Sequence, residues 1–247
     1  MMNMKVDLYN ANCLDILKEL PDKSIDLILT DPPYGTTNCI WDIPISLEDM
    51  WQELDRICKN NAAIILFGDE PFSSQLRLSS KNYKYDLIWQ KEAPTNFFQL
   101  KRRPGKITEN IHVFYKEQCT YNPIMIKHEG KLVKNKPAKK SHSSVTTGIG
   151  NGNIKPYEDT GFRYPSNVLK FNRVPRGKNK HPTQKPVELL EWLIKTYSNS
   201  EDVVLDFTMG SGSTGVAAKR LNRSFIGIEL NKEFFDIAKD RIDNDTF

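Results

Sequence analysis

Residues 203–215 read VVLDFTMGSGSTG, which predicts an apolar strand, a glycine-rich turn and the start of a helix. Gly210, Gly212 and Gly215 satisfy G-x-G-x-x-G in the context that this pattern requires, after a strand and at the opening of a helix. Glycines let the backbone approach a ligand closely, and a helix N-terminus offers free N–H groups. Glu229 ends the next expected strand, where a carboxylate can accept hydrogen bonds from both ribose hydroxyls. The stretch predicts a site for an adenosine-type cofactor, and a purely structural turn is the alternative.

The position of this unit in the chain constrains the rest of the sheet. A dinucleotide-binding fold of the usual kind begins with such a unit, whereas only one expected strand (224–229) and one helix (232–242) follow it here. The other strands must come from earlier in the chain, which disfavours an NAD-dependent enzyme. Hydrophobic patterns predict strands at 6–9, 25–30, 62–67, 85–89 and 111–115, and helices at 13–20, 47–58 and 187–197. We expect an α/β fold with a Rossmann-like, doubly wound, mostly parallel sheet in permuted order.

A second motif follows the apolar run IDLILT at residues 25–30. Asp31, Pro32, Pro33 and Tyr34 come directly after this strand, and ligands of an open α/β sheet gather at the carboxyl ends of strands. The prolines stiffen the turn and leave carbonyl acceptors beside a carboxylate and a ring. Asp31 and the Pro32 carbonyl would accept the two hydrogens of a nucleobase amine and direct its lone pair at an electrophilic carbon, while Tyr34 stacks on the extruded base. The alternative is a proline-rich turn with a capping aspartate.

Composition excludes several classes of protein. Of the 247 residues, 38% are apolar and 27% are charged, which is enough for a core. No run of about 18 apolar residues is present and the first ten residues lack the apolar stretch of a secretory signal, so we expect a cytoplasmic protein with no membrane partner. The cysteines and histidines do not show the spacing of metal ligands, so we expect reduced thiols and no metal site. These residues are Cys13, Cys39, Cys58, Cys119, His112, His128, His142 and His181.

Positive charge is concentrated in two blocks. Residues 127–140 contain six lysines and one acid, and residues 170–185 contain six basic residues and no acid. Solvated surface charge is the simpler explanation, but two blocks in a small protein favour a polyanionic partner. The first block lies within residues 117–165, where the regular hydrophobic pattern stops. We interpret this segment as an insertion between two halves of one core, 1–116 and 166–247.

The two motifs together resemble a known family. TDPPYG (30–35) followed by DFTMGSGSTG (206–215) resembles the DNA amino-methyltransferases of the permuted β group, in which the catalytic motif precedes the cofactor motif. HPTQKPVELLEWLI (181–194) is similar to the family's helix before the cofactor strand, and NANCLDIL (10–17) to its N-terminal cofactor-contacting turn. Residues 86–116 are similar to adenine-specific methylases of phages and mobile elements. The resemblance implies S-adenosylmethionine as the cofactor and adenine N6 in DNA as the acceptor.

The resemblance also implies roles for individual residues. The catalytic turn is Asp31 to Tyr34, with Glu229 as the ribose acid and Lys185 toward the methionine end. The cofactor-binding set is Asn12, Cys13, Asp31, Thr183, Lys185, Asp206, Phe207, Gly210, Gly212, Ser213, Thr214 and Glu229. The family commonly has Asp-Pro-Phe before the glycines and aspartate before the N-terminal cysteine. Here the aromatic, Phe207, is shifted by one position, and Asn12 replaces the aspartate.

An enzyme that extrudes a base must grip flanking phosphates and base edges. Residues 117–165 are the irregular segment long enough to do so, and we predict that they form the target-recognition region. Its phosphate contacts would come from Lys134, Lys136, Lys139 and Lys140, with a second contact near the catalytic cleft from Lys101, Arg102 and Arg103. A solvated insertion without a partner is the alternative. A homodimer and a cognate restriction endonuclease are further expected partners.

Several other functions compete with this interpretation. Cytosine C5 methylation needs a nucleophilic cysteine, typically after a proline, and none of the four cysteines follows one. Cytosine N4 methylation uses the same active-site logic, but its enzymes more often begin the catalytic turn with serine, so Asp31 favours adenine. An RNA or protein methyltransferase, a DNA-binding module without catalysis, and an NAD-dependent enzyme remain less favoured alternatives.

Overall fold

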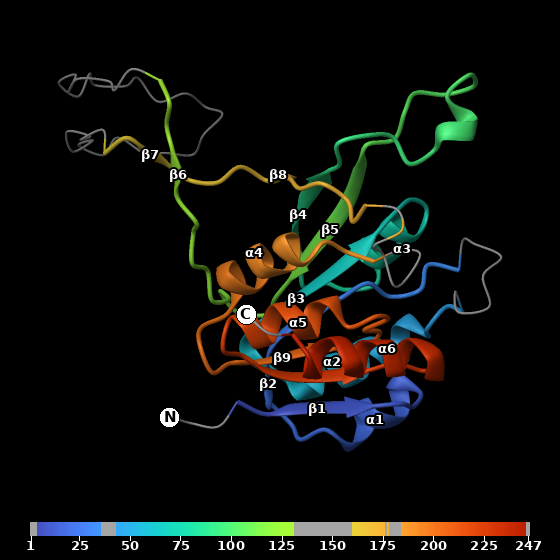
Figure 1. The fold of residues 1–247 in the computed structure, drawn as a ribbon. Helices are drawn as coiled ribbons and strands as arrows, with labels where there is room; N and C mark the ends of the chain where they lie inside the picture. The colour runs from blue at the N-terminus through green and yellow to red at the C-terminus, as the bar shows by residue number, and fades with distance from the viewer. Residues whose placement is uncertain (1–3, 36–42, 131–159, 176, 178–183, 246–247) are drawn as a thin grey trace. The chain divides into compact units, whose positions relative to one another are not determined.

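A computed structural model describes residues 4–35, 43–130, 160–175, 177 and 184–245 (Figure 1). The chain divides into a larger unit, residues 1–122 and 166–247, and a smaller unit, residues 123–165. Among the described residues, no helix has the length and apolar character needed to cross a bilayer.

The larger unit is built on one eight-stranded sheet. In spatial order its strands are β1 (Val6–Tyr9), β10 (Ser224–Ile228), β9 (Val203–Asp206), β2 (Ile25–Thr30), β3 (Cys58–Gly68), β5 (Thr108–Phe114), β4 (Tyr83–Gln90) and β8 (Val168–Lys170). Every neighbouring pair is parallel except the two pairs that β5 makes with β3 and β4. The mostly parallel sheet in permuted order is therefore confirmed.

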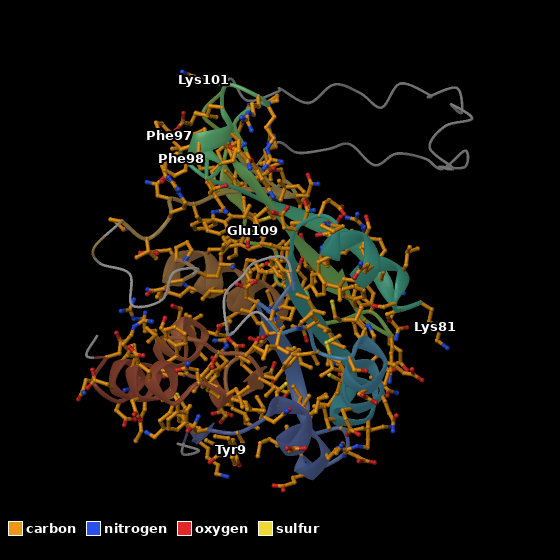
Figure 2. All side chains as sticks on the ribbon, turned by 90° about the vertical axis from the view of Figure 1, so that its right-hand side faces the viewer. Tyr9, Lys81, Phe97, Phe98, Lys101 and Glu109 are labelled. Carbon is orange, nitrogen blue, oxygen red and sulfur yellow. The ribbon has the colours of Figure 1, made fainter. Side chains whose placement is uncertain are left out.

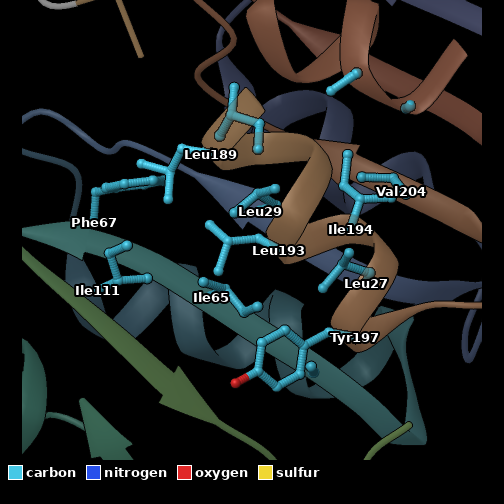
Figure 3. Close-up of a cluster of buried hydrophobic side chains, with 14 of the residues drawn as sticks. Leu27, Leu29, Ile65, Phe67, Ile111, Leu189, Leu193, Ile194, Tyr197 and Val204 are labelled. Carbon is cyan, nitrogen blue, oxygen red and sulfur yellow. The ribbon is translucent and has the colours of Figure 1, made fainter. Parts of the chain in front are cut away.

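Helices cover both faces of this sheet. The first face carries α4 (Val187–Tyr197), α5 (Ser213–Arg220) and α6 (Lys232–Asp243), and the second carries α1 (Cys13–Glu19), α2 (Leu47–Ile57) and α3 (Phe72–Leu78). Leu27 and Leu29 of β2 pack in the first cluster, where Figure 3 shows them beside Leu193 of α4, while Ile28 packs in the second. Because β2 is buried on both faces, its sequence is a continuous apolar run without alternation.

The topology brings several strand ends to one edge of the sheet. β2, β4, β9 and β10 run in the same direction, so their carboxyl ends lie at this edge. β5 runs the opposite way and therefore begins there. Residues that follow these strands, or that start β5, are consequently brought to the same edge of the sheet.

Most predicted elements occur at the expected positions. The strands at 6–9, 25–30 and 203–206 and the helix at 187–197 have the predicted bounds, while β3, β4 and β5 extend beyond the predicted strands. The sequence analysis missed α3, β8 and a short 3-10 helix, η1 (Phe97–Gln99). β8 and η1 have three residues each, too few for a hydrophobic period to be recognised, and the seven residues of α3, FSSQLRL, contain four polar residues among three apolar ones.

The smaller unit contains a two-stranded antiparallel ladder. β6 (Ile126–Lys127) pairs with β7 (Phe162–Arg163), and the His128 amide donates to the Gly161 carbonyl at 2.8 Å. The structural boundary of this unit lies at residue 123 instead of 117. Cys119 is buried in the main core, and the Asn122 side chain donates to the Ser198 carbonyl at 3.1 Å, so both belong to the larger unit. The target-recognition role of the insertion stays a prediction.

Candidate active site

A cavity of about 720 Å³ lies within the larger unit and is lined by both sequence motifs. It is large enough for a nucleoside cofactor and a base. Its wall contains most of the predicted site residues: Asn12, Cys13, Asp31, Pro32, Pro33, Tyr34, Lys185, Asp206, Phe207, Gly210, Ser213, Thr214 and Glu229. The fold thus gathers the catalytic turn after β2 and the glycine-rich turn after β9 around one space.

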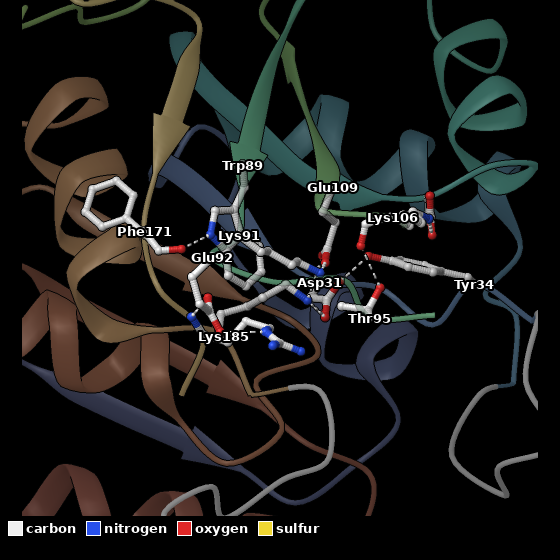
Figure 4. Close-up of polar contacts among 12 residues, drawn as sticks. Asp31, Tyr34, Trp89, Lys91, Glu92, Thr95, Lys106, Glu109, Phe171 and Lys185 are labelled. Atoms are coloured by element: carbon white, nitrogen blue, oxygen red, sulfur yellow. Dashed lines mark hydrogen bonds and ion pairs between the residues drawn. The ribbon is translucent and has the colours of Figure 1, made fainter. Parts of the chain in front are cut away.

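The Asp31 carboxylate is held on both of its oxygens. Tyr34 donates its hydroxyl hydrogen to Oδ1 at 2.6 Å, and the Lys185 ammonium donates to Oδ2 (Figure 4). Burial raises the pKa of Asp31, Lys185 opposes that rise, and the nearby Glu109 carboxylate adds to it. The Tyr34 ring stacks on Phe72, with centroids 5.1 Å apart and planes 19° apart. Both the carboxylate and the ring of the catalytic turn are therefore held in fixed orientations.

Lys185 links Asp31 to a second carboxylate. Its ammonium nitrogen lies 3.1 Å from Glu109 Oε1, and the other oxygen of Glu109 accepts from Lys91 at 2.6 Å (Figure 4). Burial alone would lower the pKa of Lys185, but Asp31 and Glu109 outweigh it and the pKa is raised. Burial would likewise raise the pKa of Glu109, but Lys185 and Lys91 make the net shift downward. Two cations and two anions thus alternate, and each favours the charged form of the neighbour with which it pairs.

Sequence reasoning missed Glu109 and Lys91. Glu109 is the second residue of β5, and Lys91 comes directly after β4 ends. Both therefore lie at the sheet edge that carries Asp31. The predicted strand began at residue 111, which left Glu109 in an unassigned loop. A strand extended to residue 108 and paired antiparallel would have brought Glu109 to this edge.

Asp206 and two threonines join the ends of β2 and β9. Asp206 Oδ1 accepts from the Thr30 hydroxyl at 2.6 Å and from the Thr208 amide at 3.2 Å. The Thr208 hydroxyl lies 2.6 Å from that of Thr30 and donates to the Asp31 carbonyl at 3.1 Å. Burial raises the pKa of Asp206 to about 6, although hydrogen bonds from Thr214 and Thr30 oppose the rise. Phe207, the shifted aromatic, is buried in the core and lines the cavity.

Glu229 connects the glycine-rich turn to the start of α6. Its Oε2 accepts from the Gly210 amide at 2.9 Å, and its Oε1 accepts from the Asn231 amide at 2.8 Å. Burial raises the pKa of Glu229 and these backbone hydrogen bonds oppose the rise. A carboxylate has about four acceptor positions, so Glu229 retains capacity for ligand hydroxyls. The donor set thus fits a nucleoside whose ribose hydroxyls need an acceptor.

The remaining predicted residues fall into three groups. Asn12 caps α1 by accepting from the Leu14 amide at 2.9 Å, and burial raises the pKa of the Cys13 thiol to about 11, so the thiol is neutral. Gly212 has φ +76°, and a Cβ placed on it would lie 2.9 Å from Ala238 Cβ, so this glycine serves the packing of α5 on α6. The second group lies outside the described residues and consists of Thr183, Lys134, Lys136, Lys139 and Lys140. The third group is exposed in the segment that follows β4 and consists of Lys101, Arg102 and Arg103.

Comparison with known proteins identifies the family. A family model described as DNA methylase, covering N6 and N4 methyltransferases, matches residues 25–240. The chain belongs to this family. It is 32% identical to the Type II methyltransferase M.HpaI of Haemophilus parainfluenzae, over 96% of this chain and 74% of that protein. It is also 28% identical to the DNA adenine methyltransferase YhdJ of Escherichia coli (strain K12), over 96% of this chain and 82% of that protein.

A solved structure agrees with this assignment. The crystal structure of the M1.HpyAVI–SAM complex is 29% identical to this DNA methylase, with a TM-score of 0.60, and the match covers 96% of this chain and 99% of that one. The resemblance inferred from the two motifs and the expected fold class are confirmed. The chain is an S-adenosylmethionine-dependent DNA methyltransferase.

We expect Asp206→Asn to change how the stability of this DNA methylase depends on pH. The folded-state pKa of Asp206 is about 6, above the ordinary value of 3.8. Its contribution to stability is therefore fully present below about pH 4 and is lost as the pH rises through about 6. Urea unfolding between pH 4 and 7 should show the wild type losing roughly 2–3 kcal/mol relative to the variant. Parallel stability curves for the two proteins would contradict this pKa.

Proposed function

We propose that this DNA methylase transfers a methyl group to the exocyclic N6 amine of an adenine extruded from the duplex. The observation that carries the proposal is the partly buried Asp31 carboxylate, which lines the cavity and is held by Lys185 and Tyr34. An adenine-specific name for one relative supports adenine as the target. The family description includes N4 enzymes, so cytosine N4 is the second candidate.

Asp31 and Pro32 would activate the target amine. The lone pair of a nucleobase amine is delocalised into the ring, which makes the nitrogen a poor nucleophile. The Asp31 carboxylate and the Pro32 carbonyl accept its two N–H hydrogens, so that the lone pair points out of the ring plane toward the methyl carbon. Lys185 and Tyr34 use one acceptor position on each Asp31 oxygen and leave others for the amine. The raised pKa of Asp31 suits it to take the proton that the methylated amine loses.

Tyr34 would position the extruded base. Its ring plane is fixed by stacking on Phe72 and by the hydroxyl contact with Asp31. A ring held in this way loses little conformational freedom when a base stacks on it. The same contacts place the ring beside the carboxylate that receives the amine.

The glycine-rich half of the cavity would hold the cofactor. When bound, S-adenosylmethionine supplies an electrophilic methyl group attached to a positively charged sulfur. Glu229 accepts the ribose hydroxyls, and Asn12 lines the cavity beside it as an amide acceptor for the adenine amine. Asp206, whose pKa is about 6 and which is therefore mostly ionised at neutral pH, places negative charge in the wall of the same cavity. Gly212 is left out of this set, because it packs against α6.

DNA is the macromolecular partner, and its contacts are proposed from charge. Lys101, Arg102 and Arg103 are exposed beyond β4, where they can bind phosphates. We assign target recognition to the insertion, together with its four lysines outside the described residues. Relatives named Type II methyltransferases support a cognate restriction endonuclease as a partner. Action in the cytoplasm and a homodimer are also part of this proposal.

The product of the reaction tests the proposal directly. DNA from a methylation-deficient host that expresses the chain should contain N6-methyladenine, detected by nucleoside digestion and mass spectrometry. Sequencing of the modified positions would give the target site. Asp31→Asn should abolish the product, because an amide cannot accept the amine proton, while it still binds S-adenosylhomocysteine. N4-methylcytosine as the sole product would overturn the adenine assignment, and an active Asp31→Asn would overturn the role of Asp31.

Glu229→Gln should weaken cofactor binding. The substitution removes a charged acceptor and places an amide N–H₂ near the Gly210 amide that now donates to Glu229. We expect a loss of roughly 1–3 kcal/mol in a calorimetric titration with S-adenosylhomocysteine. Glu233→Gln, four residues further along the chain, is the matched control because Glu233 does not line the cavity. Equal dissociation constants for Glu229→Gln and the wild type would place the ribose contact elsewhere.

Lys185 and Glu109 should shift the pH profile of methylation in opposite directions. Lys185 lowers the pKa of Asp31 and Glu109 raises it. If kcat/KM falls at acid pH because Asp31 is protonated, Lys185→Met moves that limb to higher pH and Glu109→Gln moves it to lower pH. Each shift should be roughly one pH unit. Shifts in the same direction, or none, would show that the acid limb belongs to another group.

A further inference from the structure

Two phenylalanines lie almost fully exposed at the tip of the connection between β4 and β5. Phe98 is 98% exposed and Phe97 is 70% exposed. Figure 2 shows both on a projection of the larger unit, near the labelled Lys101. Exposed aromatic side chains in such a position mark a binding surface. We name residues 96–103 the aromatic tip.

The projection that carries the aromatic tip is held by its own contacts. The Thr95 amide donates to the Lys106 carbonyl at 2.9 Å, and the Lys106 amide donates to Asn96 Oδ1 at 2.7 Å. Leu100 lies against Gly105, since a Cβ on Gly105 would lie only 3.2 Å from Leu100 Cδ2, although the leucine is 42% exposed. Leu100 thus contacts the chain that returns toward β5, and the two phenylalanines are more exposed than it is.

The base of the projection joins the charged network of the active site. Lys91, directly after β4, pairs with Glu109 at the start of β5 at 2.6 Å. Glu109 pairs with Lys185, which pairs with Asp31. The projection therefore starts at the sheet edge that carries the cavity, and the ion pairs connect its base to Asp31.

Charge favours DNA as the occupant of this surface. Residues 94–106 contain four basic residues and no acid. Lys101, Arg102 and Arg103 begin three residues after Phe98, so that an apolar wedge and cations able to bind phosphates share one short segment. Proteins that kink or open a duplex combine these features, because an apolar side chain replaces the lost base stacking.

We propose that Phe98 inserts into the base stack of the duplex beside the extruded adenine. The Phe97 ring lies edge-on to the Phe98 ring, with centroids 6.1 Å apart and planes 82° apart. Lys101, Arg102 and Arg103 then hold the flanking phosphates. This inference rests on the proposed function, because it assumes a base that leaves the duplex.

The test compares paired and mispaired targets with the full chain. The substrate is a duplex carrying the sequence that the chain methylates in host DNA, with the target adenine either paired with thymine or opposite cytosine. Phe98→Ala should lower kcat/KM on the paired duplex by about tenfold or more. On the mispaired duplex the kcat/KM of this variant should return toward that of the wild type, because a mispaired base is easier to extrude. Phe98→Trp should retain activity. Leu78→Ala is the control, since Leu78 is 88% exposed but precedes β4 and so lies at the opposite sheet edge.

A second readout reports extrusion itself. With 2-aminopurine at the target position, wild-type binding should raise the fluorescence, and Phe98→Ala should lose most of that rise while its affinity for S-adenosylhomocysteine is unchanged. Equal loss on paired and mispaired duplexes, or no loss on either, would overturn the wedge. Conversion of a dimer to a monomer by Phe98→Ala would assign the surface to a second copy and also overturn it. A wild type that methylates neither duplex would overturn the proposed function itself.

Discussion

The ion pair between Lys185 and Asp31 is the interaction on which the active site depends. A partly buried carboxylate in the wall of a cavity is destabilised in its charged form unless a cation compensates it. Lys185 supplies that cation, but its own ammonium is buried and needs more than one anion. Glu109 is the second anion, and Lys91 compensates Glu109 in turn. Removing Lys185 leaves Asp31 without its cation, and removing Glu109 leaves Lys91 without its carboxylate.

This network requires the mixed topology of the sheet. Asp31 follows the parallel strand β2, whereas Glu109 is the second residue of β5, the strand that is antiparallel to both of its neighbours. Only a strand that begins at the carboxyl edge can present its first residues there. The antiparallel strand is therefore the element that completes the charge balance of the catalytic turn. It also forms, with β4, the stem of the projection that ends in the aromatic tip.

Local sequence predicted the core and the two motifs because both carry strong local signals. The apolar run of β2 and the glycine-rich turn after β9 have few other structural explanations. Glu109 gave no such signal, since its partners Lys185 and Lys91 are distant in sequence or lie across a loop. The packing role of Gly212 was missed for a related reason: the pattern shows that a glycine is needed, but not whether ligand or helix approaches it. A single sequence does not show which residues that are distant along the chain contact one another in the fold.

The contact between β2 and β9 explains why the permuted order works. The two strands are neighbours in the sheet, and Thr30, Thr208 and Asp206 join their ends by hydrogen bonds. Each half contributes a strand, a turn and a helix, so the site forms wherever these strands pair, whichever half comes first in the chain. The price of this arrangement is a buried Asp206 whose ionisation opposes folding above about pH 6. Asp206 also lines the cavity, so a positively charged ligand bound there would favour its ionised form and couple ligand affinity to the stability of the seam between the halves.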